Sequence, residues 1–181
     1  MGVSVIWSYM DQKGTGRIRK FVAVDQPAAV AAVPWMTDAE QSESGATFGV
    51  DGLVDLGASL NGEDGTAATE RFVRSMFSGT PAQEVWDFVA QGITSTPAYA
   101  GVPLLFDHAT QDWRDVLPRI DVPTLVLGCD GSRVSPDSQR YIADRIPNAQ
   151  LHVFPTDVAN SHFMFLENPE AFNAVVEEFL S

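Results

Sequence analysis

The sequence is poor in cysteine and in basic residues. Among its 181 residues there is one cysteine, Cys129, which excludes an internal disulfide and any cluster of cysteine ligands around a metal. Lysine and arginine together number 11 against 24 aspartates and glutamates, so the net charge is −13. Because such a balance repels phosphates, we expect neither nucleic acid nor an anionic membrane surface as a partner.

Long apolar runs are missing as well. No stretch approaches the roughly 20 apolar residues that a membrane helix needs, so no membrane segment is expected. No secretory leader precedes the first helical segment, which favours a cytoplasmic location unless residues precede Met1. The remaining composition, 45% hydrophobic and 19% charged, is that of a globular protein with a core.

Three short apolar runs predict buried parallel strands. They are 21–25 (FVAVD), 123–129 (PTLVLGC) and 150–154 (QLHVF). Helical periodicity is found at 3–13, 136–146 and 168–180. The last of these helices has Asn168 as its predicted N-cap and Pro169 at its first position. Alternating strands and helices are typical of a doubly wound α/β sheet.

Residues 36–112 interrupt this alternation. The stretch 37–65 is rich in Gly, Ser, Asp and Glu and shows little periodicity. Helices are predicted at 66–77, at 81–94 after a Thr80 cap, and at 97–109. Because one crossover needs far fewer residues, we interpret 36–112 as a mostly helical cap over a core formed by 1–35 and 113–181. The alternative is a set of ordinary crossover helices.

One histidine, His162, lies in the loop between the last predicted strand and the last predicted helix. The segment SHFMFLENPEAFNAVVEEFL that contains it resembles the catalytic-histidine region of α/β-hydrolases, in which an apolar pair, a Leu-Glu-x-Pro turn and a C-terminal helix follow the histidine. A loop position suits the role, because the imidazole must reach over the edge of the sheet. A capping histidine beside a helix start is the alternative.

The first two residues, Met1 and Gly2, run directly into a helix. In many esterases and haloperoxidase-like members of the family, the turn that carries the nucleophile reads Gly-His-Ser-Met-Gly, and Met-Gly resembles its end. The resemblance implies a serine immediately before Met1, on an N-terminal half of the hydrolase that would be this chain's partner. It also implies that the Met1 backbone N–H contributes to the oxyanion hole. Met-Gly is equally a common translation start.

The acid of the triad has two candidates. In most of the family it follows the strand before the histidine strand, but residue 132, where the spacing from Pro136 expects it, is a serine. Asp130 lies close by, out of register. Asp25 ends the strand FVAVD, and some members of the fold, such as haloalkane dehalogenases, carry the acid at that strand end. We favour Asp25, with Asp130 as the alternative, because the acid has only to orient the imidazole.

The remaining candidates concern the substrate and cofactors. Aromatic and apolar residues of the cap and its neighbours are expected to line an apolar pocket, with the expected set being Trp35, Met76, Phe77 and Phe163. His108 and His152 have no partner at metal-ligand spacing, so no metal is predicted. No nucleotide fingerprint is present, and no cofactor is expected.

Together these features predict an α/β-hydrolase fold and, by resemblance, a serine hydrolase of small hydrophobic carboxylic esters that is inactive without its nucleophile. Lactone hydrolysis, carbon–carbon bond hydrolysis, amide hydrolysis and perhydrolysis use the same machinery and stay open. A non-catalytic ligand-binding or interaction protein also stays open, because the usual acid position holds no carboxylate. A dehalogenase or epoxide hydrolase fits less well, since those enzymes use an aspartate nucleophile.

Overall fold

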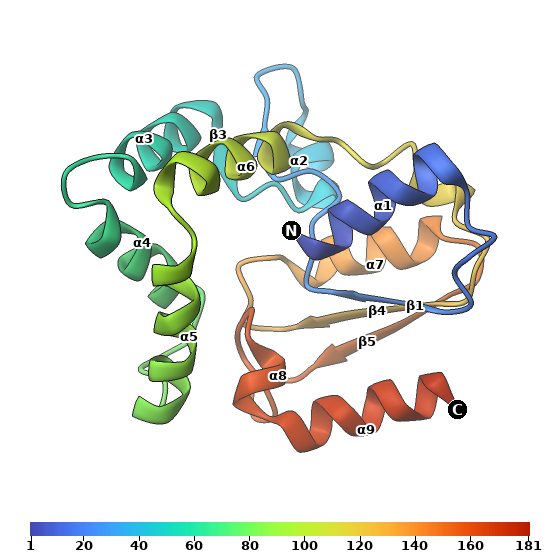
Figure 1. The fold of residues 1–181 in the computed structure, drawn as a ribbon. Coiled ribbons are helices and arrows are strands. Elements are labelled where there is room, and N and C mark those ends of the chain that lie inside the picture. The colour runs from blue at the N-terminus through green and yellow to red at the C-terminus, as the bar shows by residue number, and fades with distance from the viewer.

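A sheet of three parallel strands forms the centre of the molecule. The structure is a computed structural model that describes residues 1–181 apart from the side chain of Thr94. The strands are β1 (Phe21–Val24), β4 (Thr124–Cys129) and β5 (Ala149–Phe154), in the order β1–β4–β5. Every residue of β4 is buried, which explains its uninterrupted apolar run, because both faces of a parallel sheet are covered. The carboxyl ends of the three strands meet at one edge (Figure 1).

Helices cover both faces of the sheet. α1 (Gly2–Lys13) and α7 (Pro136–Arg145) lie on one face, and α8 (Met164–Glu167) and α9 (Pro169–Leu180) lie on the other (Figure 1). The first face packs around Trp7, Val126 and Ile142. The second face packs around Leu125, Leu127 and Phe179. Neighbouring residues of β4 therefore serve opposite cores, as the alternation of side chains along a strand requires.

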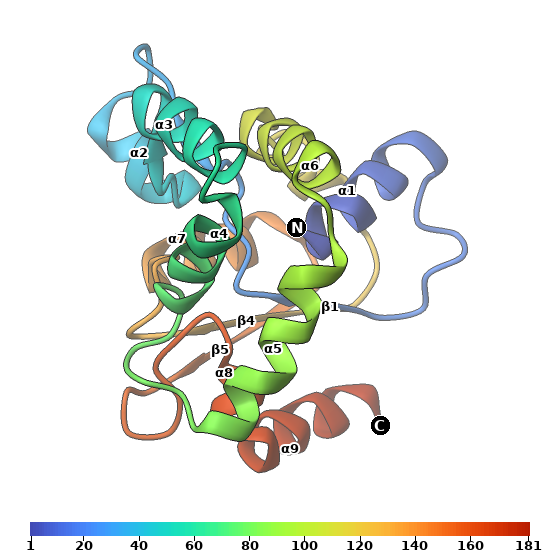
Figure 2. The same cartoon turned by 60° about the vertical axis from the view of Figure 1, so that its left-hand side comes forward.

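Five helices lie between β1 and β4 in the sequence. They are α2 (Asp38–Ser44), α3 (Val50–Leu60), α4 (Gly65–Arg74), α5 (Gln83–Ser95) and α6 (Ala98–Thr110). Two short parallel strands, β2 (Ala31–Ala32) and β3 (Phe48–Gly49), pair among them, and a 3₁₀ turn, η1 (Leu117–Arg119), precedes β4. Helices α3, α4 and α5 lie beyond the carboxyl edge of the sheet, as two views show (Figures 1 and 2). α2, in contrast, packs against α7 and so joins a layer of the sheet.

The sequence predicts no individual helix within 37–65, whereas α2 and α3 occupy most of that stretch. The signal was present at Thr37 and Glu40, which form a capping box: Glu40 N donates to Thr37 Oγ1 at 3.2 Å, and Thr37 N donates to Glu40 Oε2 at 2.8 Å. Thr80 is not a helix cap, since α5 begins two residues later than predicted, after Ala82. The predicted cap Asn168 does begin α9, and the helix predicted at 136–146 begins at Pro136 with Ser135 as its N-cap.

Two loops meet closely at the carboxyl edge of the sheet. A Cβ at Gly131, in the loop after β4, would lie 1.6 Å from Asn160 Oδ1 and 2.7 Å from the Asn160 backbone oxygen. Asn160 belongs to the loop after β5. Only glycine permits this approach, so the backbone of one loop fixes the position of the other.

We expect Gly131→Ala to lower the free energy of unfolding by about 1–3 kcal/mol, because the added methyl group must displace backbone as well as a side chain. Denaturant unfolding followed by circular dichroism measures the change. Gly79→Ala is the matched control, since a Cβ there meets nothing within 4 Å. Equal midpoints for the two variants would contradict the close contact.

Candidate active site

His162 lies on the loop between β5 and α8, above the carboxyl edge of the sheet. Its backbone N–H donates to the Met76 carbonyl at 3.2 Å, and the thiol of Cys129 lies 3.2 Å from the carbonyl oxygen of the preceding residue, Ser161. The loop is thus held from the cap side and from the end of β4. The His162 side chain remains 34% exposed, so its loop is held in place while the ring stays accessible from solvent.

Asp25 immediately follows β1 and is buried. Its backbone N–H donates to the Leu127 carbonyl at 2.8 Å, which continues the ladder between β1 and β4. Its φ is +47°, and no other non-glycine residue in the described chain has a positive φ. This left-handed conformation costs an aspartate roughly 1 kcal/mol and is held here by the surrounding contacts.

The structure brings His162 and Asp25 together. His162 Nδ1 lies 2.7 Å from Asp25 Oδ2, and an ionised carboxylate can only accept, so Nδ1 is the donor. In the neutral imidazole this leaves the lone pair on Nε2. Ser132 Oγ donates to the same Oδ2 at 2.5 Å. The other oxygen, Oδ1, is buried with no hydrogen-bond partner among the described residues.

Asp130, the alternative acid, is exposed and is not brought to His162. Its backbone N–H donates to the Phe154 carbonyl at 3.0 Å, which continues the pairing of β4 with β5. The residue of that loop that reaches the pair is Ser132, which stands where the family's usual acid is expected. Sequence reasoning had treated Ser132 only as a missing acid and not as a hydrogen-bond donor to Asp25.

A cavity of about 260 Å³ opens beside the pair. His162, Asp25 and Met1 line it, and its walls are mainly apolar. The apolar lining residues are Pro27, Val30, Phe48, Phe72, Met76, Leu105 and Val134. Met76, one of the residues expected to line a pocket, is among them. Phe48, Phe72, His108 and Arg133 were not singled out, because nothing in their local pattern marks a cavity formed by seven separate segments.

The Met1 nitrogen lies at the same cavity and donates to Gln26 Oε1 at 3.0 Å. Gln26 is itself buried, and its Nε2 donates to the Pro27 carbonyl at 3.0 Å. The nitrogen that the resemblance assigns to an oxyanion hole is thus hydrogen-bonded to the residue that follows Asp25. Its part in catalysis stays a prediction.

The other predicted pocket residues are placed differently. Trp35 is 81% exposed and lines a separate apolar groove with Val50 and Val54, so it does not line the cavity beside His162. Phe163 meets the His162 ring edge-on at 5.4 Å and packs on Phe77 at 4.5 Å between centroids. Phe163 therefore packs between the His162 ring and Phe77, and neither phenylalanine is among the residues that line the cavity.

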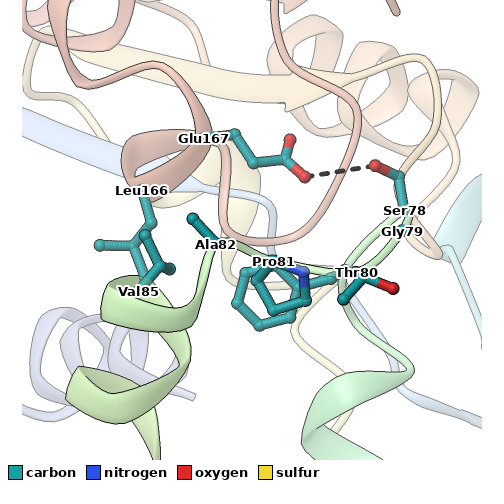
Figure 3. A pocket seen from close by; sticks show the side chains of 9 residues that line it. Ser78, Gly79, Thr80, Pro81, Ala82, Val85, Leu166 and Glu167 are labelled. Carbon is teal, nitrogen blue, oxygen red and sulfur yellow. Dashed lines mark hydrogen bonds between the residues drawn. The ribbon is translucent and has the colours of Figure 1, made fainter.

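Phe77 instead lines a second cavity, of about 270 Å³, between the start of α5 and α8 (Figure 3). Ser78 and Glu167 face each other across it, with Ser78 Oγ donating to Glu167 Oε1 at 3.3 Å (Figure 3). The other oxygen of Glu167 accepts from Asn160 N at 2.8 Å. This carboxylate therefore connects the loop before α5 to the histidine loop.

Neither a metal cluster nor a membrane span is found in the described part of the chain. No three of its His, Cys, Asp and Glu side chains are grouped so that they could hold a metal ion. None of its helices is both long enough and apolar enough to cross a bilayer.

His108, on α6, adds a titratable group to the cavity wall. Burial lowers the pKa of its imidazole to about 4, and its Nδ1 is buried with no hydrogen-bond partner among the described residues. The folded chain therefore holds His108 neutral, whereas the unfolded chain takes up a proton near pH 6.5.

We expect His108 to make the folded chain less stable as the pH falls from about 6.5 to about 4, because only the unfolded chain binds the extra proton in that window. Since the side chain is partly exposed, the loss should be on the order of 1 kcal/mol. Urea unfolding of His108→Gln across this range should show a shallower loss than the unmodified chain. Parallel curves for the two proteins would disprove this linkage.

Comparison with known proteins agrees with the parallel sheet and its flanking helices. The chain is 27% identical over 168 residues to a protein of Synechocystis sp. whose name describes it provisionally as a non-heme chloroperoxidase. That match covers 86% of this chain and 56% of the relative. A shorter match, 33% over 69 residues, joins 38% of the chain to 25% of the pyrrolizixenacetamide deacetylase of Xenorhabdus hominickii. The chain thus spans little more than half the length of the first of these relatives.

Solved structures share the fold at low sequence identity. The bromoperoxidase of Bacillus anthracis superposes with a TM-score of 0.85 at 16% identity, over 99% of this chain and 64% of that one. An esterase from Exiguobacterium antarcticum gives 0.81 at 17% identity, over 98% and 63%. The model of the alpha/beta hydrolase family matches residues 5–175, which confirms the predicted fold. By this match over nearly its whole length, the chain belongs to the α/β-hydrolase family.

Proposed function

We propose that the chain supplies the acid–base residues of a serine hydrolase that acts on carboxylic esters. The observation that carries the proposal is the 2.7 Å contact between His162 Nδ1 and Asp25 Oδ2 at the wall of an apolar cavity. A carboxylate that fixes one imidazole nitrogen leaves the other free to take a proton from a nucleophile. The size and apolar walls of the cavity favour a small hydrophobic ester.

Each half of the proposed reaction, acylation and deacylation, uses two proton transfers at His162. A serine oxygen attacks the ester carbonyl while its proton passes to Nε2, and Asp25 stabilises the imidazolium that results. The imidazolium then gives the proton to the alcohol oxygen as the carbon–oxygen bond breaks. Water attacks the acyl-enzyme with the same two transfers, releasing the carboxylic acid and restoring the serine.

We further propose that the serine is the residue joined to the Met1 nitrogen. That nitrogen lies at the cavity with His162, and α1 begins there at Gly2, as expected for a nucleophile on a strand-to-helix turn. The Met1 amide would then donate to the oxyanion of the tetrahedral intermediate. The exposed apolar side chains of Val5 and Ile6 on α1 give a further segment a surface to cover.

The other edge of β1 supports the same partner. In the described sheet β1 pairs with β4 on one side only, and Phe21 and Ala23 on it are buried. An unpaired edge of an apolar parallel strand is a site for pairing with another strand. We propose that the segment carrying the nucleophile pairs here.

We expect a fluorophosphonate probe to label one serine in the protein isolated from its source, because such probes require an activated hydroxyl. Peptide mass spectrometry should place the label on a peptide whose sequence continues into Met1-Gly2. His162→Ala should abolish labelling and ester turnover, and His152→Ala, on β5, is the matched control and should keep both. Label on a serine within residues 1–181, or no label at all, would refute the proposed nucleophile.

The role of Asp25 is tested by moving its carboxylate. Asp25→Asn should lower kcat by roughly ten-thousand-fold with little change in KM, as in other triads. Ser132→Ala should lower kcat by about tenfold, because Asp25 Oδ2 loses one of its two donors.

A second experiment moves the carboxylate to the loop after β4. Adding Ser132→Asp to the Asp25→Asn protein should recover part of the rate, because Ser132 Oγ already lies beside the oxygen that holds His162. Placing Asn there is the control, and equal rates for the two double variants would argue against an orienting carboxylate.

A further inference from the structure

Arg133 is the one cation among the described side chains that line the cavity beside His162. Its Nη1 donates to Ser75 Oγ at 2.9 Å, and the guanidinium carbon lies 5.4 Å from the centroid of the Phe48 ring. The chain on either side of the Arg133–Ser75 contact also touches His162 and Asp25. Ser75 precedes Met76, whose carbonyl accepts from the His162 backbone, and Ser132, next to Arg133, contacts Asp25. The guanidinium is therefore held near the reacting centre.

No carboxylate forms an ion pair with Arg133 in the part of the chain that the structure describes. Arg114, Arg119 and Arg140 each pair with an aspartate, whereas Arg133, like most of the basic residues of the described chain, does not. A guanidinium has five N–H donors, and a serine oxygen and an aromatic face satisfy only part of that capacity. The side chain, exposed at the rim of the cavity, retains donors for an anion.

We propose that Arg133 binds a carboxylate carried by the substrate itself. The preferred substrate is then a half-ester of a dicarboxylic acid, or a lactone with a free carboxylate, whose apolar chain lies against Phe48, Phe72 and Met76. The inference rests on the proposed hydrolase function and names its substrate class. The planar fork of a guanidinium matches a carboxylate. A phosphate dianion fits less well, because Arg133 is the only cationic side chain among the described residues that line the cavity, and Asp25 adds negative charge there.

The test compares two esters of the same six-carbon diacid that differ in charge, monomethyl adipate and dimethyl adipate. Each is titrated into the 181-residue chain at low salt, and the imidazole resonances of His162 and His108 report binding. This measurement requires no nucleophile and no turnover. We expect monomethyl adipate to bind more tightly, and Arg133→Met to weaken it by about tenfold while leaving dimethyl adipate unchanged.

Two further variants separate binding of an anion from a purely structural role. Ser75→Ala removes the contact between Arg133 and α4 but keeps the guanidinium, so it should retain the preference for monomethyl adipate. Arg140→Met removes an arginine that pairs with Asp137 on α7, outside the cavity, and should also retain it. Equal binding of the two ligands, or loss of both in Arg133→Met, would overturn the inference.

Hydrolysis by the protein from its source separates this inference from the proposed function. If both adipate esters are hydrolysed at equal rates and Arg133→Met changes neither, the substrate class is wrong and the hydrolase stands. If neither ester is hydrolysed and fluorophosphonate labels no serine, the hydrolase proposal fails. The titration of the 181-residue chain still decides whether Arg133 selects a carboxylate.

Discussion

The carboxylate of Asp25 is the group on which the rest of the site depends. It is 1% exposed, and removing a charge from water to this extent costs several kcal/mol unless hydrogen bonds replace the lost solvent. Here His162 and Ser132 both approach one oxygen, Oδ2. The three side chains come from three separate segments, so the requirement to satisfy one buried charge draws the ends of β1 and β4 and the histidine loop together.

The backbone around this carboxylate is arranged to the same end. Asp25 takes a left-handed conformation as it leaves β1, which turns its side chain away from the path the strand would continue along. Gly131 lets the loop after β4 approach Asn160 closely, and that contact positions the segment leading to His162. Strain at one residue and the absence of a side chain at another are thus both used to place an imidazole, as is typical where structure serves chemistry.

The segment from α4 to Met76 gives the cavity an apolar wall, and it also holds Arg133, which we propose selects the substrate. Phe72 and Met76 come from the end of α4 and the loop behind it, so the same segment supplies apolar surface and the carbonyl that holds the His162 backbone. Arg133 reaches across from the loop after β4 to Ser75 at that helix end. The residues proposed to contact substrate therefore also join α4 to the histidine loop and to the loop after β4, and a change in one set of contacts is expected to affect the other.

Local sequence signals determined much of this protein. Apolar runs mark the buried strands, Asn168 and Pro169 mark the start of α9, and the turn that follows His162 marks the histidine loop. Each of these signals depends only on residues near one another in the chain. The helices at 37–65 were missed although Thr37 and Glu40 carry a capping signal, since a short polar helix such as α2 shows little apolar periodicity.

Contacts between residues that are distant in the sequence were decided only by the tertiary structure. Asp25 and His162 are 137 positions apart, and Asp25 and Ser132 are 107 apart, so no window of sequence could show that a serine at the usual acid position supports an acid on another strand. The same holds for Trp35, which is near Asp25 in sequence yet exposed on a separate groove. Composition fixes which side chains are available, and the parallel sheet decides which of them meet, because it gathers the ends of strands from remote parts of the chain at one edge.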